Sequence, residues 1–201
     1  TDAKDNSSVI NLDYVNPLSE KSKLELGAEA RITRTDNDYA TNRAGIENAG
    51  FTYDFDIYSA YATFGQKFTK FSYQLGARVE SYQVKANYTT TTQTGKFEND
   101  YITVYPSAYL NYSLNEKNIF NLSLSRRVDR PSIQQTKPIR TYSTPRITGI
   151  GNAELTPQFT NSAELSYTKV VNKSSITANV FYRAISDQIS QVFLNDETAD
   201  P

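Results

Sequence analysis

Carboxylates in this sequence fall into pairs whose spacing could support two-carboxylate chemistry. The pairs are Asp36 with Asp38, Asp54 with Asp56, and Glu98 with Asp100. Residues two apart in a strand share one face, which is the arrangement that a glycoside hydrolase needs for its acid and its base. Nothing around these pairs indicates a substrate cleft, so we expect solvated charges near loops and strand ends.

Residues for metal or nucleophilic chemistry are scarce. The chain of 201 residues contains no Cys and no His, so it lacks thiol nucleophiles, disulfides, the commonest general base and the commonest metal ligand. The segment Asp36-Asn37-Asp38 offers oxygens to calcium, but the glycine and terminal glutamate of an EF-hand loop are missing. We therefore predict no enzyme activity, no cofactor and no metal site.

Composition narrows the remaining classes. Lys and Arg (21) nearly balance Asp and Glu (22), so the net charge gives no reason to expect a nucleic acid partner. The 15 Tyr and 10 Phe residues, without any Trp, favour strands and a boundary between water and apolar surroundings. Apolar residues never run more than three in a row, whereas a membrane-spanning helix needs about 20.

Apolar and polar residues alternate with a period of two along most of the chain, which predicts half-buried strands. In the clearest case Phe71, Tyr73, Leu75, Ala77 and Val79 oppose Ser72, Gln74, Gly76, Arg78 and Glu80. The same split recurs at 24–33, 102–112, 120–125, 159–167 and 175–183. The chain is therefore predicted to be all-β.

Short and long connections between these strands alternate. Short polar turns are expected at 17–22, 67–70, 115–118 and 172–174, and long loops at 35–50, 87–100 and 131–158. The pattern predicts an antiparallel meander of about eight strands, with tight turns at one end and large loops at the other. Residues 1–201 are expected to be a single β-barrel segment, because both chain ends resemble cuts through loops of a larger barrel.

The alternation alone fits either a membrane barrel or a soluble β-sandwich. Predicted strands of about 10 to 14 residues suit a tilted membrane crossing better than an ordinary soluble sheet. Aromatic residues near the short turns, such as Phe64, Phe68 and Phe71, suit an interfacial girdle. We therefore predict part of a transmembrane outer-membrane β-barrel, in which Leu75, Leu110 and Leu122 touch lipid. A soluble β-sandwich acting as a binding or adhesin-like module is the alternative.

Charged residues on the polar faces are candidates for lining the lumen. They are Glu25, Glu29, Arg31, Arg78, Glu80, Glu164 and Arg183. Cross-strand pairs of opposite charge explain them, at about 0.2 to 1 kcal/mol for each pair; a polar track for substrate or plug is the functional alternative. In the predicted loops, Tyr39, Tyr88 and Tyr142 are candidate ligand contacts.

Two motifs carry a family resemblance. They are Ser125-Arg126-Arg127-Val128-Asp129-Arg130-Pro131-Ser132, and Gly151-Asn152-Ala153-Glu154-Leu155-Thr156-Pro157 followed by Thr160-Asn161-Ser162-Ala163-Glu164-Leu165-Ser166-Tyr167. They resemble stretches of TonB-dependent receptor barrels, most closely the outer membrane β-barrel protein family of Gram-negative bacteria with a carboxypeptidase-regulatory-like N-terminal domain. The hairpin pattern extends the resemblance across nearly the whole chain.

The resemblance implies a barrel of about 22 strands in the bacterial outer membrane. A plug occludes such a barrel, and energy passed by TonB drives import of a scarce nutrient. The implied partners are outer-membrane lipid, an extracellular small-molecule or oligomeric nutrient, and TonB through the plug. This chain is expected to supply only part of the wall and the extracellular loops, since the plug, the TonB box and the barrel-ending strand are absent from these residues. Chelated iron, cobalamin, glycan and peptide all stay open as substrates.

Overall fold

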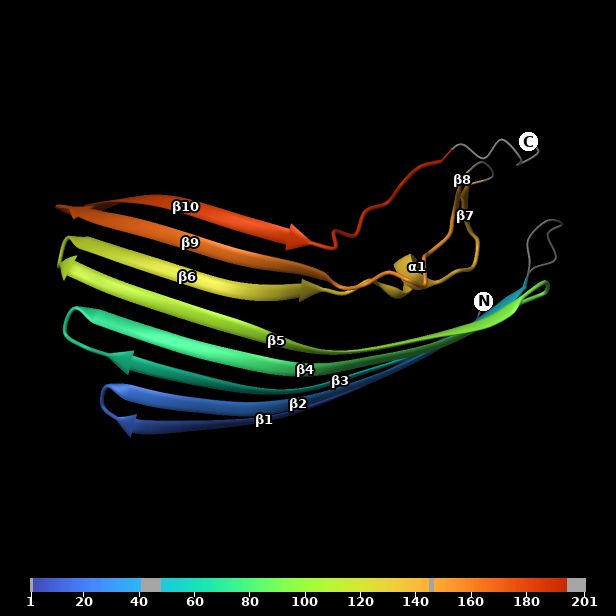
Figure 1. Cartoon of the computed structure of the whole chain (residues 1–201), viewed down its shortest axis with the longest axis horizontal. Coiled ribbons are helices and arrows are strands. Elements are labelled where there is room, and N and C mark those ends of the chain that lie inside the picture. Colours follow the sequence, from blue (N-terminus) through green and yellow to red (C-terminus); the bar gives the residue numbers. More distant parts are fainter. Residues whose placement is uncertain (1, 41–47, 145–146, 195–201) are drawn as a thin grey trace.

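The computed structural model describes residues 2–40, 48–144 and 147–194. Eight strands form one sheet in the order β1-β2-β3-β4-β5-β6-β9-β10 (Figure 1). Their bounds are β1 Asp2–Ser19, β2 Ser22–Tyr39, β3 Ala49–Lys67, β4 Phe71–Thr90, β5 Thr94–Asn115, β6 Asn118–Asp129, β9 Gln158–Val171 and β10 Ser174–Ser186. Between β6 and β9 lie helix α1 (Ile133–Thr136) and a ribbon of β7 (Thr141–Thr144) and β8 (Ile147–Gly149).

This arrangement confirms the predicted antiparallel meander. All seven neighbouring pairs in the sheet are antiparallel, and the β7–β8 ribbon is the only other sheet among the described residues. The β-sandwich alternative therefore does not describe this fold, because the described residues contain no second large sheet that could cover the first. No helix among the same residues is long and apolar enough to cross a membrane.

The predicted short turns are confirmed. Within the predicted ranges, two residues join β1 to β2, β5 to β6 and β9 to β10, and three join β3 to β4. Asn172, in the turn between β9 and β10, has a positive φ of 55°, a left-handed conformation that Asn tolerates better than most residues. All four turns lie at the same end of the sheet, whereas α1 and the ribbon lie at the other end (Figure 1).

The predicted long loops at 35–50 and 87–100 are wrong in large part. Strands β1 to β5 contain 18 to 22 residues, and their pairing continues through Asp36 with Thr52 and Asn87 with Lys96. At about 3.4 Å per residue these strands are roughly 60 to 75 Å long. A membrane crossing needs only about 9 to 11 residues, so about half of each long strand lies beyond that length.

The half of the sheet next to the short turns, called here the turn half, has one apolar and one polar face. In β4 the apolar set 71–79 points to one side, called the outward face, while Gln74, Arg78 and Glu80 point to the inward face. Val79 lies beside Ala60 of β3 and Val104 of β5, so the apolar surface continues across strands. Leu75 is half exposed there, as expected for a side chain that no protein layer covers.

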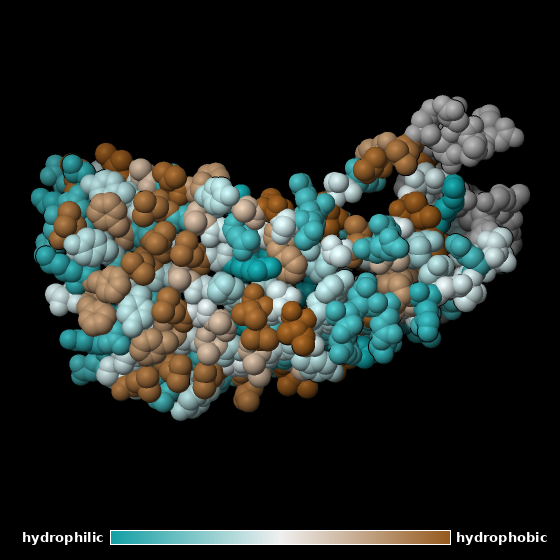
Figure 2. Space-filling view, viewed as in Figure 1, coloured by the Kyte–Doolittle hydropathy of each residue, from teal (hydrophilic) through white to brown (hydrophobic). Residues whose placement is uncertain are grey.

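The other half of the sheet, called the far half, reverses this polarity. Beyond Ser81 the outward residues of β4 are polar, and Gln83 lies between Asp56 and Asp100. The inward residues become apolar, and Val84 and Ala86 are buried with Phe51, Tyr53 and other side chains in the core of the molecule. Figure 2 shows the outcome over β1 to β5, where hydrophobic side chains gather toward the short turns and hydrophilic ones toward the far ends.

The long connection after β6 is folded onto the inward face of the far half. Residues 130–139, called here the strap, contribute Ile139 to the buried core, and Ile133 packs against it. The Nζ of Lys137 lies 5.1 Å from the centre of the Phe51 ring. The predicted loop at 131–158 is thus confirmed as a break in the ladder, but its first part packs against the sheet instead of standing free as a loop.

Candidate functional site

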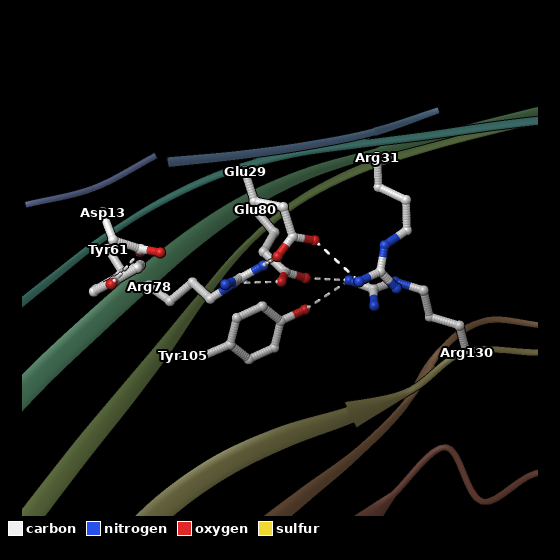
Figure 3. A network of polar contacts seen from close by, with 8 residues as sticks. All are labelled: Asp13, Glu29, Arg31, Tyr61, Arg78, Glu80, Tyr105 and Arg130. Atoms are coloured by element: carbon white, nitrogen blue, oxygen red, sulfur yellow. Dashed lines mark hydrogen bonds and ion pairs between the residues drawn. The ribbon is translucent and has the colours of Figure 1, made fainter. Parts of the chain in front are cut away.

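Four charged residues of the inward face, Glu29, Arg31, Arg78 and Glu80, meet where the turn half ends. Strand β4 supplies Arg78 and Glu80, which are two residues apart and share a face. The Nε of Arg78 donates to Glu80 at 2.7 Å, and its Nη2 lies 3.4 Å from a Glu29 oxygen of β2. Arg31 pairs with the same Glu29 at 3.2 Å. Figure 3 shows these side chains of β2 and β4, the two strands on either side of β3, pointing toward one another.

Arg130 completes this network from outside the ladder. It is the first residue after β6, and its guanidinium pairs with Glu80 and donates to the Tyr105 hydroxyl at 3.5 Å (Figure 3). The guanidinium carbon also lies 4.9 Å from the centre of the Tyr82 ring. The side chains of Glu80 and Arg130 are only 10% and 20% exposed. Removing one partner of such a buried pair leaves an uncompensated charge, which typically costs about 3 to 5 kcal/mol.

Nearer the short turns, Asp13 accepts a hydrogen bond from the Tyr61 hydroxyl at 2.6 Å. Glu25 pairs with Lys23 at 2.5 Å, two residues along the same strand. Most carboxylates of this face therefore have a cationic or hydroxyl partner. The face can offer hydrogen bonds, but the carboxylates of the network are already engaged.

The predicted lumen-lining residues are only partly brought together. Glu29, Arg31, Arg78 and Glu80 form the network, whereas Glu25 lies apart from it with Lys23. Glu164 and Arg183 share the inward face, but they do not lie opposite each other. In the register Glu164 is opposite Phe181, not Arg183, and the Arg183 guanidinium instead lies 5.5 Å from the Phe181 ring centre.

Two of the three candidate loop tyrosines belong to long strands of the sheet. Tyr39 ends β2 and Tyr88 belongs to β4, so neither lies in a loop. Tyr88 packs against the buried core, and Tyr39 is 38% exposed. Tyr142 belongs to β7, but its side chain lies outside the described part of the structure, so its role stays a prediction.

Sequence reasoning missed Arg130, Asp13, Tyr61 and Tyr105 as members of the network. Arg130 lies beyond the last strand residue, where alternation gives no information about direction. Asp13 belongs to β1, which lies outside the ranges in which alternation was predicted. Tyr61 and Tyr105 alternate correctly with apolar neighbours, so their inward direction could have been predicted, but not their polar partners.

The carboxylate pairs of the opening hypothesis lie on the outward face of the far half. Arg34 donates to both oxygens of Asp56, at 2.5 and 3.1 Å, and lies 3.7 Å from Asp54. Glu98 pairs with Lys85 at 2.8 Å, and this ammonium group lowers the pKa of Glu98. A general acid needs the opposite shift. Among the described residues no group of acidic side chains is placed to hold a metal ion.

Comparisons with known proteins agree with this geometry. A family model described as the outer membrane protein beta-barrel family matches residues 1–200. No curated protein matches the sequence. The fold is similar to the crystal structure of the ferric yersiniabactin uptake receptor FyuA from Yersinia pestis, with a TM-score of 0.69 and 13% identity.

The match to FyuA covers 92% of this chain and 29% of that one. A second solved structure, the RagAB peptide importer in a closed-closed state, gives a TM-score of 0.47 at 12% identity, over 91% of this chain and 30% of that chain. The chain thus spans less than a third of the length of either protein.

Proposed function

Since this chain belongs to the outer membrane protein beta-barrel family, we propose that it forms part of the wall of a receptor that imports a nutrient across the bacterial outer membrane. The chain itself is an outer-membrane protein, as its family indicates. Its turn half would cross the bilayer with the apolar face toward lipid, and its far half would stand outside the cell.

The observation that carries this proposal is the exchange of polarity between the two halves. A barrel wall needs apolar side chains toward lipid and polar ones toward the lumen, over about 25 Å of height. The turn half has this arrangement, and the far half has the opposite one, which suits a sheet surrounded by water. Among the described residues β1 and β10 each have one neighbouring strand, so we propose that further strands close the barrel.

The inward charges support contact with a plug or a passing nutrient. Glu29, Arg78 and Glu80 lie where the lumen of such a barrel would be. In a receptor driven by TonB, a plug would occupy this space and pass the energy on. We assign no catalytic role to the wall, because Asp54 and Asp56 are bound by Arg34, and Glu98 is bound by Lys85.

Uptake by cells tests this proposal. Cells that lack the gene for the receptor containing this chain would be compared with complemented cells, with TonB present or deleted. The panel would contain ferric siderophores, cobalamin, oligosaccharides and peptides. We expect uptake of at least one compound to need both the receptor and TonB. Uptake that depends on neither protein, across the whole panel, would contradict the import function.

A further inference from the structure

The strap takes an indirect path between two strands that are neighbours. β6 and β9 pair with each other, so a loop joining them could rise directly from their ends. Instead the chain turns inward after Asp129 and reaches across the face of β5 to residues of β4 and β3. A segment of that kind reduces the free space inside a barrel.

The first end of the strap is fixed by charge and by a helix cap. Arg130 pairs with Glu80 of β4, and the next residue, Pro131, is buried. Ser132 caps α1: its hydroxyl accepts from the Gln135 backbone N–H at 3.4 Å, and the Gln135 side chain accepts from the Ser132 N–H at 2.8 Å. This capping box satisfies the backbone groups that a short helix leaves free.

The middle of the strap is fixed by packing. Thr136 and Ile139 are 5% and 7% exposed, and Ile139 lies in one cluster with Phe51 and Val84. Burial lowers the pKa of Lys137, whose ammonium lies over the Phe51 ring. An aromatic surface that would otherwise face the lumen is thereby covered by the chain itself.

Backbone hydrogen bonds from the returning chain also hold the strap, at Gln135 and Lys137. The Gly151 N–H donates to the Lys137 carbonyl at 2.9 Å, and the Asn152 N–H donates to the Gln135 carbonyl at 2.7 Å. A Cβ added to Gly151 would lie 2.6 Å from the backbone N and O of Lys137, so only glycine allows this approach. Arg130 therefore holds the start of the strap, and Gly151 holds it at Lys137.

We propose that the strap is a permanent constriction of the lumen above the membrane, kept inside the barrel by the Arg130–Glu80 pair and by the Gly151 contact. This inference rests on the proposed function, because a strap narrows a lumen only if the sheet is a barrel wall. The open part of the lumen would then lie away from β3, β4 and β5, whose inward face the strap occupies.

Thiol labelling of intact cells tests the constriction. The 201 residues of this chain contain no cysteine. Single cysteines can therefore be placed in the full receptor once any cysteines elsewhere in that receptor are replaced. Val84→Cys lies in the core beside the strap, and Gln83→Cys points outward from the adjacent position. A small membrane-impermeant maleimide should label Gln83→Cys rapidly and Val84→Cys very slowly.

Loosening either contact should expose Val84→Cys. Arg130→Gln or Gly151→Ala, combined with Val84→Cys, should raise the labelling rate of this cysteine more than about tenfold, because the rate follows the population of molecules in which the strap is open. Arg130→Lys, combined in the same way, should raise the rate less. Labelling of Gln83→Cys and heat-modifiable gel mobility should not change, which shows that the barrel is folded. Rapid labelling of Val84→Cys in the otherwise unmodified receptor, or slow labelling that neither variant speeds, would overturn the proposal.

Leu75→Cys separates failure of the strap from failure of the wall. If the turn half crosses the membrane, this cysteine is shielded by lipid and stays unlabelled. Labelling of Leu75→Cys would contradict the wall itself. If Leu75→Cys stays unlabelled while Val84→Cys is labelled rapidly, the result contradicts only the proposal that the strap constricts the lumen.

Discussion

The turn half and the far half of the sheet share the same strands but place apolar residues on opposite faces. Along β4, Leu75 and Val79 are outward, whereas Val84 and Ala86 are inward and buried. Neither the β3–β4 nor the β4–β5 register contains a shift between them. The reversal is therefore a change of side-chain choice on an unbroken ladder, and under the proposed function it marks the level at which the surrounding medium changes from lipid to water.

The largest expected effect is in the core of the far half. Phe51 is 1% exposed, so Phe51→Ala should lower the free energy of unfolding by about 3 to 5 kcal/mol. Urea unfolding of the receptor in lipid vesicles measures this loss. Lys96→Ala, on the outward face of the same half, should stay within about 0.5 kcal/mol. Equal losses from the two variants would show that the inward face of the far half is not a core.

The turn half should respond to charge on its outward face. Leu75→Arg would place a cation against acyl chains and should cost about 2 to 4 kcal/mol. Ser123→Arg is the matched inward change, next to Glu164 in the register, and should cost about 1 kcal/mol or less. The same unfolding assay applies, and a tolerated Leu75→Arg would argue against lipid at this face.

A smaller effect should come from Lys137. Its pKa in the folded protein is lowered by burial, so the folded state binds this proton less tightly than the unfolded state does. Stability should rise with pH between the lowered pKa and the ordinary value of about 10.5. Lys137→Met should remove this rise in unfolding measurements between pH 8 and pH 10.5. A variant with the same pH dependence as the unmodified protein would exclude Lys137 as its source.

The smallest effect is expected at Glu98. Its pair with Lys85 lies on the outward face of the far half, with both side chains more than half exposed. Water and salt screen such a pair, so Glu98→Gln should leave the unfolding midpoint unchanged. A clear loss of stability would mean that another surface covers this face.

Much of the turn half could be predicted from sequence, because one medium on each side gives a strict period of two. The split between Leu75 and Arg78 and the four short turns followed from that rule. The far half could not be predicted in the same way, since polar residues such as Asp36 and Asn87 indicate a loop when a strand is expected to be apolar on its outward face. Apolar and polar residues alternate equally well in the far half, but there the apolar residues lie on the inward face.

The charged network was predictable only in part. Alternation placed Glu29, Arg78 and Glu80 on one face, and their contacts followed from the strand register. Arg130 was beyond reach, because its direction depends on the path of the strap and not on a strand period. The motifs around Arg130 and Gly151 gave the family resemblance, but their role in holding the strap depends on the path of the folded chain.

A spin-label scan along β4 tests the reversal of polarity most directly. Single nitroxides at positions 73 to 87 of the receptor in lipid vesicles would be compared for accessibility to oxygen and to a water-soluble nickel complex. We predict that 75, 77 and 79 favour oxygen, that 83, 85 and 87 favour nickel, and that 84 and 86 are shielded from both. Nickel accessibility at 75, 77 and 79 equal to that at 83 and 85 would contradict the account.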